Sequence, residues 1–175
     1  MNRTFALLFG AAFAAILWSC GRTWEIPVPK SMVIQEITKQ FPLEKNGILS
    51  VKLADPNVEF DGGRGKIVIH LKVRVSAPLG LAAREGSLTV ESGLGYNDAK
   101  KSVVLKEPAL SQISIAGLDS AKLGQARELI IPLIGKALDG LTAHAFDQHS
   151  AVEKLASRHL AGFRITNDDL IIKVK

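Results

Sequence analysis

Residues 66–75 read KIVIHLKVRV, an alternation of apolar and polar side chains that only Val68 interrupts. Successive side chains of a β-strand point to opposite faces, so this segment predicts a strand with one apolar and one solvated face. Parallel sheets are usually covered on both faces, whereas an antiparallel sheet can leave one face in water. The segment therefore predicts an antiparallel sheet. Its apolar face would carry Ile67, Ile69, Leu71, Val73 and Val75.

Further strands are predicted on both sides of this one along the chain. They cover residues 48–60, 87–96 and 102–118. Turn sequences at residues 61–63 (DGG) and 97–98 (ND) connect strands that follow one another, which is typical of a meander. Pro56 and Pro108 interrupt the first and last strands, and such breaks favour a curved sheet.

The apolar period changes to that of a helix over residues 121–146. Residues 129–134, LIIPLI, are apolar almost all round, so this part of the helix must be covered on every side. Pro132 removes one backbone hydrogen bond and would kink the helix, which would let it follow a curved sheet. Short helices over residues 32–40 and 151–159 and a hairpin over residues 162–175 complete the chain. We expect an α+β fold: a curved antiparallel meander of about four long strands, plus a C-terminal hairpin, wrapped around a long proline-containing C-terminal helix.

The composition bounds the classes of protein to consider. The 175 residues are 47% hydrophobic, which is enough for a core, and the length is typical of one domain. The single cysteine excludes an intrachain disulfide framework and a zinc site built from several thiolates. The net charge of +5 is spread along the chain without a dense basic run, so we expect no nucleic-acid partner.

Residues 1–19 have the pattern of a lipoprotein signal peptide. Arg3 precedes an apolar run over residues 5–17, which is typical of a signal peptide and short for a membrane-spanning helix. Residues 17–20, LWSC, resemble a bacterial lipobox, which implies that Cys20 becomes the acylated first residue of a mature domain over residues 20–175. An uncleaved anchor with a buried cysteine, or cleavage by the ordinary signal peptidase, is the alternative.

Acylation of Cys20 would anchor the mature protein through palmitate-type chains. Each buried CH₂ contributes about 0.8 kcal/mol, so two or three long chains would hold a small domain on a membrane. Gly21 stands where lipoproteins kept at the inner membrane often carry Asp. By that resemblance we expect the periplasmic face of the outer membrane rather than the inner membrane.

Sequence motifs for catalysis and metal binding are weak. His144, Asp147 and His149 are the best metal candidates, but the histidines are five apart, and zinc sites usually need three or four converging ligands. Residues 62–65, GGRG, lead into a strand and lack the Lys-Ser/Thr of a phosphate-binding loop, so they predict a turn. No serine stands in a G-x-S-x-G motif. We therefore predict no catalytic residue, no metal, no cofactor and no enzymatic activity.

Several segments together resemble a known family. They are Cys20, VVLKE at residues 103–107, IIPLIGKAL at 130–138, LASRHLAGFRI at 155–165 and LIIKV at 170–174. The chain resembles the YceB-like (DUF1439) family of bacterial envelope lipoproteins across residues 20–175. That family's fold is similar to half of a tubular lipid-binding (TULIP-type) module, a curved antiparallel sheet rolled around a long helix. The resemblance implies lipid binding.

A sheet rolled around a helix has an apolar interior, which becomes a ligand groove wherever side chains do not fill it. We expect a lipid, fatty-acyl chain or other apolar ligand in this groove. The candidate lining residues are Ile67, Ile69, Leu71, Ile113, Ile115, Ile130, Leu133, Ile134 and Leu138. A fully packed core is the alternative, in which case the protein would be a structural or assembly factor of the cell envelope. Its protein partners, its oligomeric state and the identity of a ligand stay open at this point.

Overall fold

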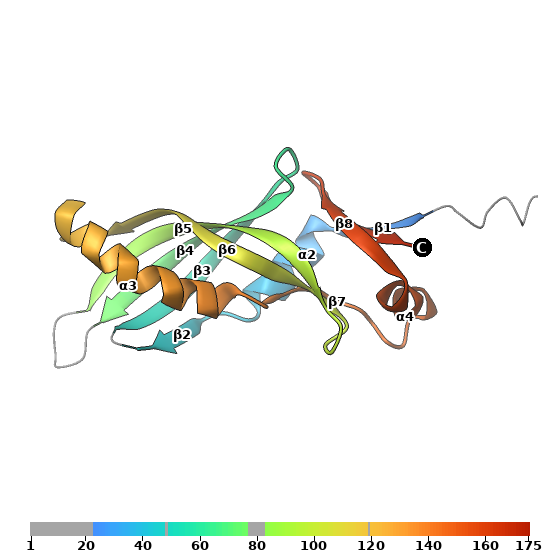
Figure 1. The fold of residues 1–175 in the computed structure, drawn as a ribbon, viewed down its shortest axis with the longest axis horizontal. Coiled ribbons are helices and arrows are strands. Elements are labelled where there is room, and N and C mark those ends of the chain that lie inside the picture. Colours follow the sequence, from blue (N-terminus) through green and yellow to red (C-terminus); the bar gives the residue numbers. More distant parts are fainter. Residues whose placement is uncertain (1–22, 48, 77–82, 119) are drawn as a thin grey trace, which may run out of the picture.

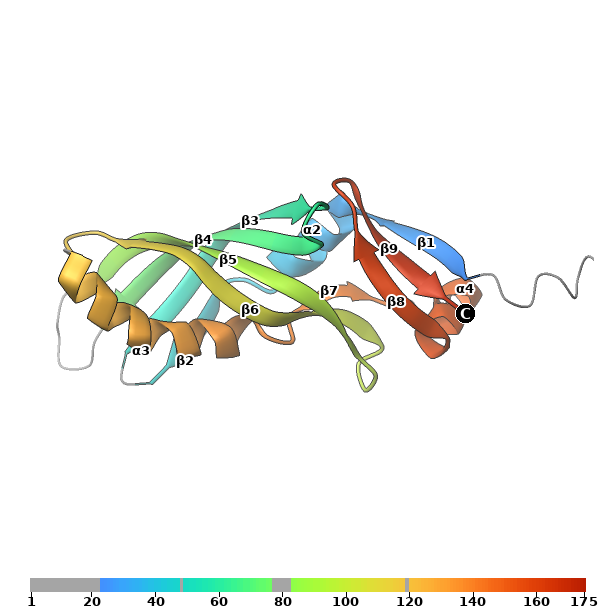
Figure 2. The same cartoon turned by 45° about the horizontal axis from the view of Figure 1, so that its top comes forward.

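The computed structural model describes residues 23–175 except residues 48, 77–82 and 119. Its larger layer is an antiparallel sheet in the order β2-β3-β4-β5-β6-β7, curled into a half-barrel (Figure 2). The strands of this sheet are β2 (Leu43–Asn46), β3 (Ser50–Asp61), β4 (Lys66–Ser76), β5 (Arg84–Asn97), β6 (Ser102–Ile115) and β7 (Thr142–Ala145). The four long strands β3 to β6 are the predicted meander, and the α+β class is confirmed. The short edge strands β2 and β7 were not predicted.

The predicted interruptions are bulges within continuous strands. The pairing of β3 with β4 shifts between Ala54 and Asn57, where Asp55 has a φ of 51°. Strand β6 continues past Pro108, and its pairing with β5 shifts nearby, between Glu91 and Gly93. Because a bulge bends its strand and increases the local twist, these two positions help to curl the sheet.

Helix α3 (Ser120–Leu138) runs along the open side of the half-barrel (Figures 1 and 2). It contacts β6 and, across the opening, β2 and β3. Ile130, Ile134 and Leu138 are buried beneath it. Their spacing of four residues places them on one face of the helix, which therefore closes the half-barrel with an apolar stripe. Helix α2 (Lys30–Thr38) packs at the other end, against β7 and β3.

The long helix is shorter than the sequence predicts. It ends at Leu138 instead of Phe146, and Thr142–Ala145 forms β7 against β6. Gly140 has a φ of 78°, which is a common way to end a helix because glycine adopts this conformation without strain. The helical period of the sequence continues beyond Gly140, but pairing with β6 determines the structure there.

The position of the C-terminal hairpin also differs from the prediction. Strands β8 (Leu160–Ile165) and β9 (Asp169–Val174) form the predicted hairpin, but they belong to a separate sheet in the order β1-β9-β8. That sheet packs against α2 and α4 (Ala151–Arg158), not around α3. Strand β1 (Trp24–Pro29) contains two prolines, which an edge strand tolerates because one side of it needs no hydrogen-bond partner.

The two sheets share a continuous apolar core, joined through Val33 and Ile37 of α2. Both side chains are fully buried between the half-barrel and the smaller sheet. The predicted signal peptide over residues 1–19, as well as Cys20 and Gly21, lies outside the described residues.

Candidate functional site

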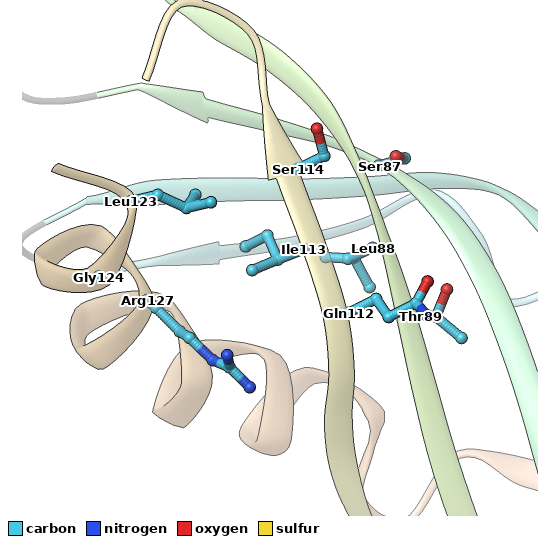
Figure 3. Close-up of a pocket in the computed structure, with 9 residues that line it drawn as sticks. All are labelled: Ser87, Leu88, Thr89, Gln112, Ile113, Ser114, Leu123, Gly124 and Arg127. Carbon is cyan, nitrogen blue, oxygen red and sulfur yellow. The ribbon is translucent and has the colours of Figure 1, made fainter. Parts of the chain in front are cut away.

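A cavity of about 550 Å³ lies between the first half of α3 and the neighbouring parts of β5 and β6 (Figure 3). Its walls are formed by Ser87, Leu88, Thr89, Gln112, Ile113, Ser114, Leu123, Gly124 and Arg127. The cavity is therefore located between sheet and helix, as the groove hypothesis requires. Its volume lies in the usual range for small-molecule sites, about 300–1,000 Å³.

The apolar part of the wall comes from both layers. Leu88 and Ile113 are paired across β5 and β6, so they share the face of the sheet that is turned to the helix. Leu123 points toward them from α3 (Figure 3). Leu88 is buried, whereas Ile113 and Leu123 are half-buried, so the apolar surface continues from the core to the cavity mouth.

The polar wall residues contribute differently. Ser87, Thr89, Gln112 and Ser114 alternate with Leu88 and Ile113 along the strands. Alternation directs their side chains to the opposite face of the sheet, and Figure 3 shows them turned away from α3. These residues therefore close the cavity mainly with their backbone.

The cavity exists because the two halves of α3 pack differently. The second half buries Ile130, Ile134 and Leu138, whereas Leu123 and Ala126 in the first half are only half-buried. Gly124 presents no side chain, and a Cβ atom added there would meet nothing within 4 Å. The sheet and the helix therefore pack closely at one end of α3 and leave space at the other.

Arg127 is the charged residue in the cavity wall. Its side chain is exposed and extends from α3 toward β6 (Figure 3). Within the described part of the chain it forms no ion pair. The guanidinium group thus supplies a positive charge at the edge of an apolar surface.

Of the nine candidate lining residues, Ile113 lines this cavity. Leu133 is half-buried and lies near Gly47, before β3. The other candidates are part of the closed core: Ile67, Ile69, Leu71, Ile115, Ile130, Ile134 and Leu138. Sequence reasoning identified the two layers but not the end at which they separate.

Sequence reasoning also did not single out Leu88, Leu123 and Arg127 as site residues. One feature of the sequence could have indicated the site. Arg127 is four residues after Leu123 and three before Ile130, so a charge interrupts the apolar stripe of α3. A charged residue on the inner face of a helix indicates that the face reaches solvent or a ligand at that point.

A second cavity, of about 390 Å³, lies beside α2, β7 and α4, and His144 and Glu153 are among its wall residues. His144 Nε2 is 3.7 Å from Glu153 Oε2. Burial lowers the pKa of His144 below its ordinary value of 6.5, and the carboxylates of Glu153 and Glu36 partly oppose this effect. The imidazole is therefore neutral at pH 7.

The three metal candidates do not converge. His144 lies on β7, whereas Asp147 and His149 belong to the turn before α4, where the Asp147 Oδ1 atom accepts the His149 N–H at 2.8 Å. Across the described residues, no group of three or more His, Cys, Asp or Glu side chains is arranged to hold a metal ion. The GGRG segment forms the turn between β3 and β4, in which Asp61 Oδ1 accepts the Arg64 N–H at 3.0 Å.

Comparison with known proteins identifies one family. The model of a family described as "Protein of unknown function (DUF1439)" matches residues 31–169, from α2 to the first residue of β9. No curated protein matches the chain. Within the described residues, no helix has both the length and the apolar character needed to cross a membrane.

Proposed function

Because this chain belongs to the DUF1439 family, we propose that it is a lipoprotein of the bacterial envelope and that it binds an apolar ligand. The ligand would be a lipid, or part of one, held in the cavity between α3 and the sheet. This function involves no chemical reaction. It requires neither a cofactor nor a metal.

The observation that carries the proposal is the 550 Å³ cavity with apolar walls from both layers. Leu88 and Ile113 form its sheet side, and Leu123 forms its helix side. An acyl chain in this space would leave water, and each buried CH₂ group would contribute about 0.8 kcal/mol.

The proposal includes the membrane anchor predicted from the sequence. Acyl chains on Cys20 would tether the domain, with the outer membrane and its periplasmic face as the expected location. The family's likeness to half of a tubular lipid-binding module supports lipid as the ligand class. The curled sheet with a helix along its open side is compatible with that likeness.

The test is direct measurement of bound lipid. The chain from Gly21, which keeps every described residue, is purified without detergent, extracted with organic solvent and analysed by mass spectrometry. We expect stoichiometric lipid, or uptake of a fluorescent fatty acid by the extracted protein. Absence of both would contradict the proposal.

A pair of variants locates the site. Leu123→Trp should narrow the cavity between helix and sheet and weaken uptake of the fluorescent fatty acid. Leu129→Trp places the same side chain on the outer side of α3, where Leu129 is 46% exposed, and should leave uptake unchanged. Circular dichroism of both variants checks that the fold is retained. Equal uptake by both variants would place the ligand elsewhere.

A second function, a structural or assembly factor without a ligand, is favoured by large apolar side chains that are exposed on the same helix. Leu129 and Ile131 are 46% and 42% exposed and, being two residues apart, lie on opposite flanks of the helix. Large exposed apolar side chains often mark protein-binding surfaces. Under this alternative, the purified chain would contain no lipid, and Leu129→Glu would release a protein partner.

A further inference from the structure

We infer that the ligand is an anionic amphiphile with one acyl chain, and that Arg127 binds the carboxylate or phosphate of its head group. This inference rests on the proposed function and adds the chemical class of the ligand. It depends on the position, the charge and the surroundings of Arg127.

The position of Arg127 is unusual for an arginine. Leu123, Arg127, Ile130, Ile134 and Leu138 follow one another at intervals of three or four residues, so they form a single stripe along α3. The other members of the stripe are apolar, and the last three are buried against the sheet. Arg127 therefore takes a core-facing position at the end of the helix where the sheet and helix separate.

Within the described residues, no acidic side chain neutralises the charge of Arg127. Arg64, Arg74 and Arg164 each form an ion pair with a glutamate. Arg127 has no such partner among the residues that the structure describes. An arginine presents a planar fork of N–H donors that binds a carboxylate or a phosphate through two hydrogen bonds.

The surroundings of Arg127 match both parts of an amphiphile. Its guanidinium lies at the exposed side of the cavity, and Leu123, Ile113 and Leu88 provide the adjacent apolar surface (Figure 3). A ligand with an anionic head and an apolar tail would satisfy both. The volume of about 550 Å³ is moderate for a ligand site and suits one chain better than several.

The experiment compares head groups on the same chain. The delipidated chain from Gly21 is titrated with a fluorescent fatty acid, with the methyl ester of that acid, and with a lysophosphatidic acid as competitor. We expect the acid to bind at least about tenfold more tightly than the ester, as removal of a charged hydrogen bond predicts. The relative affinities of the acid and the lysophosphatidic acid then distinguish a carboxylate head from a phosphate head.

Three variants assign the effect to the guanidinium. Arg127→Gln should weaken binding of the acid about tenfold and leave binding of the ester unchanged. Arg127→Lys keeps the charge and should restore part of the affinity. Arg158→Gln removes an exposed arginine from α4, outside the cavity, and should change neither affinity. Thermal unfolding of each variant checks its folding.

The outcomes separate this inference from the proposed function. Equal binding of acid and ester, unaffected by Arg127→Gln, would overturn the inference and leave the apolar cavity as a lipid site. Binding of inorganic phosphate that depends on Arg127, without binding of any acyl probe, would indicate a site for a free anion and overturn both. Failure of every probe to bind would also contradict both.

Discussion

Ile134 and Ile131 lie almost one helical turn apart on α3 but in opposite environments. Ile134 is 1% exposed in the core between helix and sheet, whereas Ile131 is 42% exposed on a flank of the helix. Ile134→Ala should lower the free energy of unfolding by about 2–5 kcal/mol, because it removes buried methyl groups and leaves a cavity. Ile131→Ala should change it by about 0.5 kcal/mol or less. Urea denaturation measures both, and similar losses would contradict the packing of α3 described above.

His144 should make stability depend on pH. Burial lowers its pKa in the folded protein, so the unfolded chain takes up the proton first as the pH falls below about 6.5. The free energy of unfolding should therefore be highest above pH 6.5 and decrease toward pH 5. The charged groups around the imidazole are Glu36 of α2, Lys39 directly after that helix, Asp147, and Glu153 on α4. The carboxylates of Glu153 and Glu36 reduce the effect without reversing it.

The measurement is urea denaturation at pH 7.5 and pH 5.5 for the wild type and two variants. His144→Leu should reduce the loss of stability at the lower pH. His149→Leu, at an exposed position in the following turn, should keep that loss. An unchanged pH dependence in His144→Leu would show that other groups cause it.

At the scale of the elements, Gln40 joins α2 to β7. The Gln40 Nε2 donates to the Thr142 carbonyl at 2.7 Å, and the Thr142 N–H donates to Gln40 Oε1 at 3.1 Å. The side-chain amide thus satisfies both backbone groups of Thr142 in place of a neighbouring strand.

Gln40→Ala should lower the free energy of unfolding by about 1–3 kcal/mol, because it leaves these half-buried backbone groups without their partner. Gln35→Ala removes an exposed amide from α2 and serves as the control, with an expected change of about 0.5 kcal/mol or less. Chemical denaturation compares the two. Hydrogen exchange at Thr142 should also become faster in Gln40→Ala only.

Whole-molecule geometry bears on the proposed anchor. Strand β1 begins at one end of the molecule, beside the C-terminus, and α3 begins at the opposite end (Figures 1 and 2). The cavity is next to that first half of α3. In the proposed arrangement, acyl chains on Cys20 would hold the β1 end of the molecule at the membrane. The cavity would then lie toward the opposite end of the molecule.

The anchor itself is tested by labelling. Cells that express the full chain are given radioactive palmitate, and we expect the label on the wild-type protein and none on Cys20→Ser. Ser19→Ala keeps a small residue before the cysteine and should retain the label. Label on Cys20→Ser, or none on the wild type, would contradict the lipoprotein proposal.

The amino-acid sequence predicted the elements whose structure depends on neighbours along the chain. Alternation over residues 66–75 predicted β4, and Asp55-Pro56 marked the bulge in β3. The helical period predicted that Ile130, Ile134 and Leu138 face the sheet, but they belong to the closed core and do not line a groove as expected. The edge strand β7 was missed because its four residues continue a helical period and become a strand only by pairing with β6.

By itself, the sequence determined an antiparallel meander, a proline-containing helix with an apolar stripe, and a C-terminal hairpin, because strand and helix periods are local properties of the chain. Only the tertiary structure decided that β1 joins the hairpin in a separate sheet and that α3 closes the half-barrel at one end but not at the other. Those features depend on backbone pairing and side-chain packing between segments that are far apart in the sequence. The same difference in packing between the two halves of α3 leaves Arg127 beside a cavity.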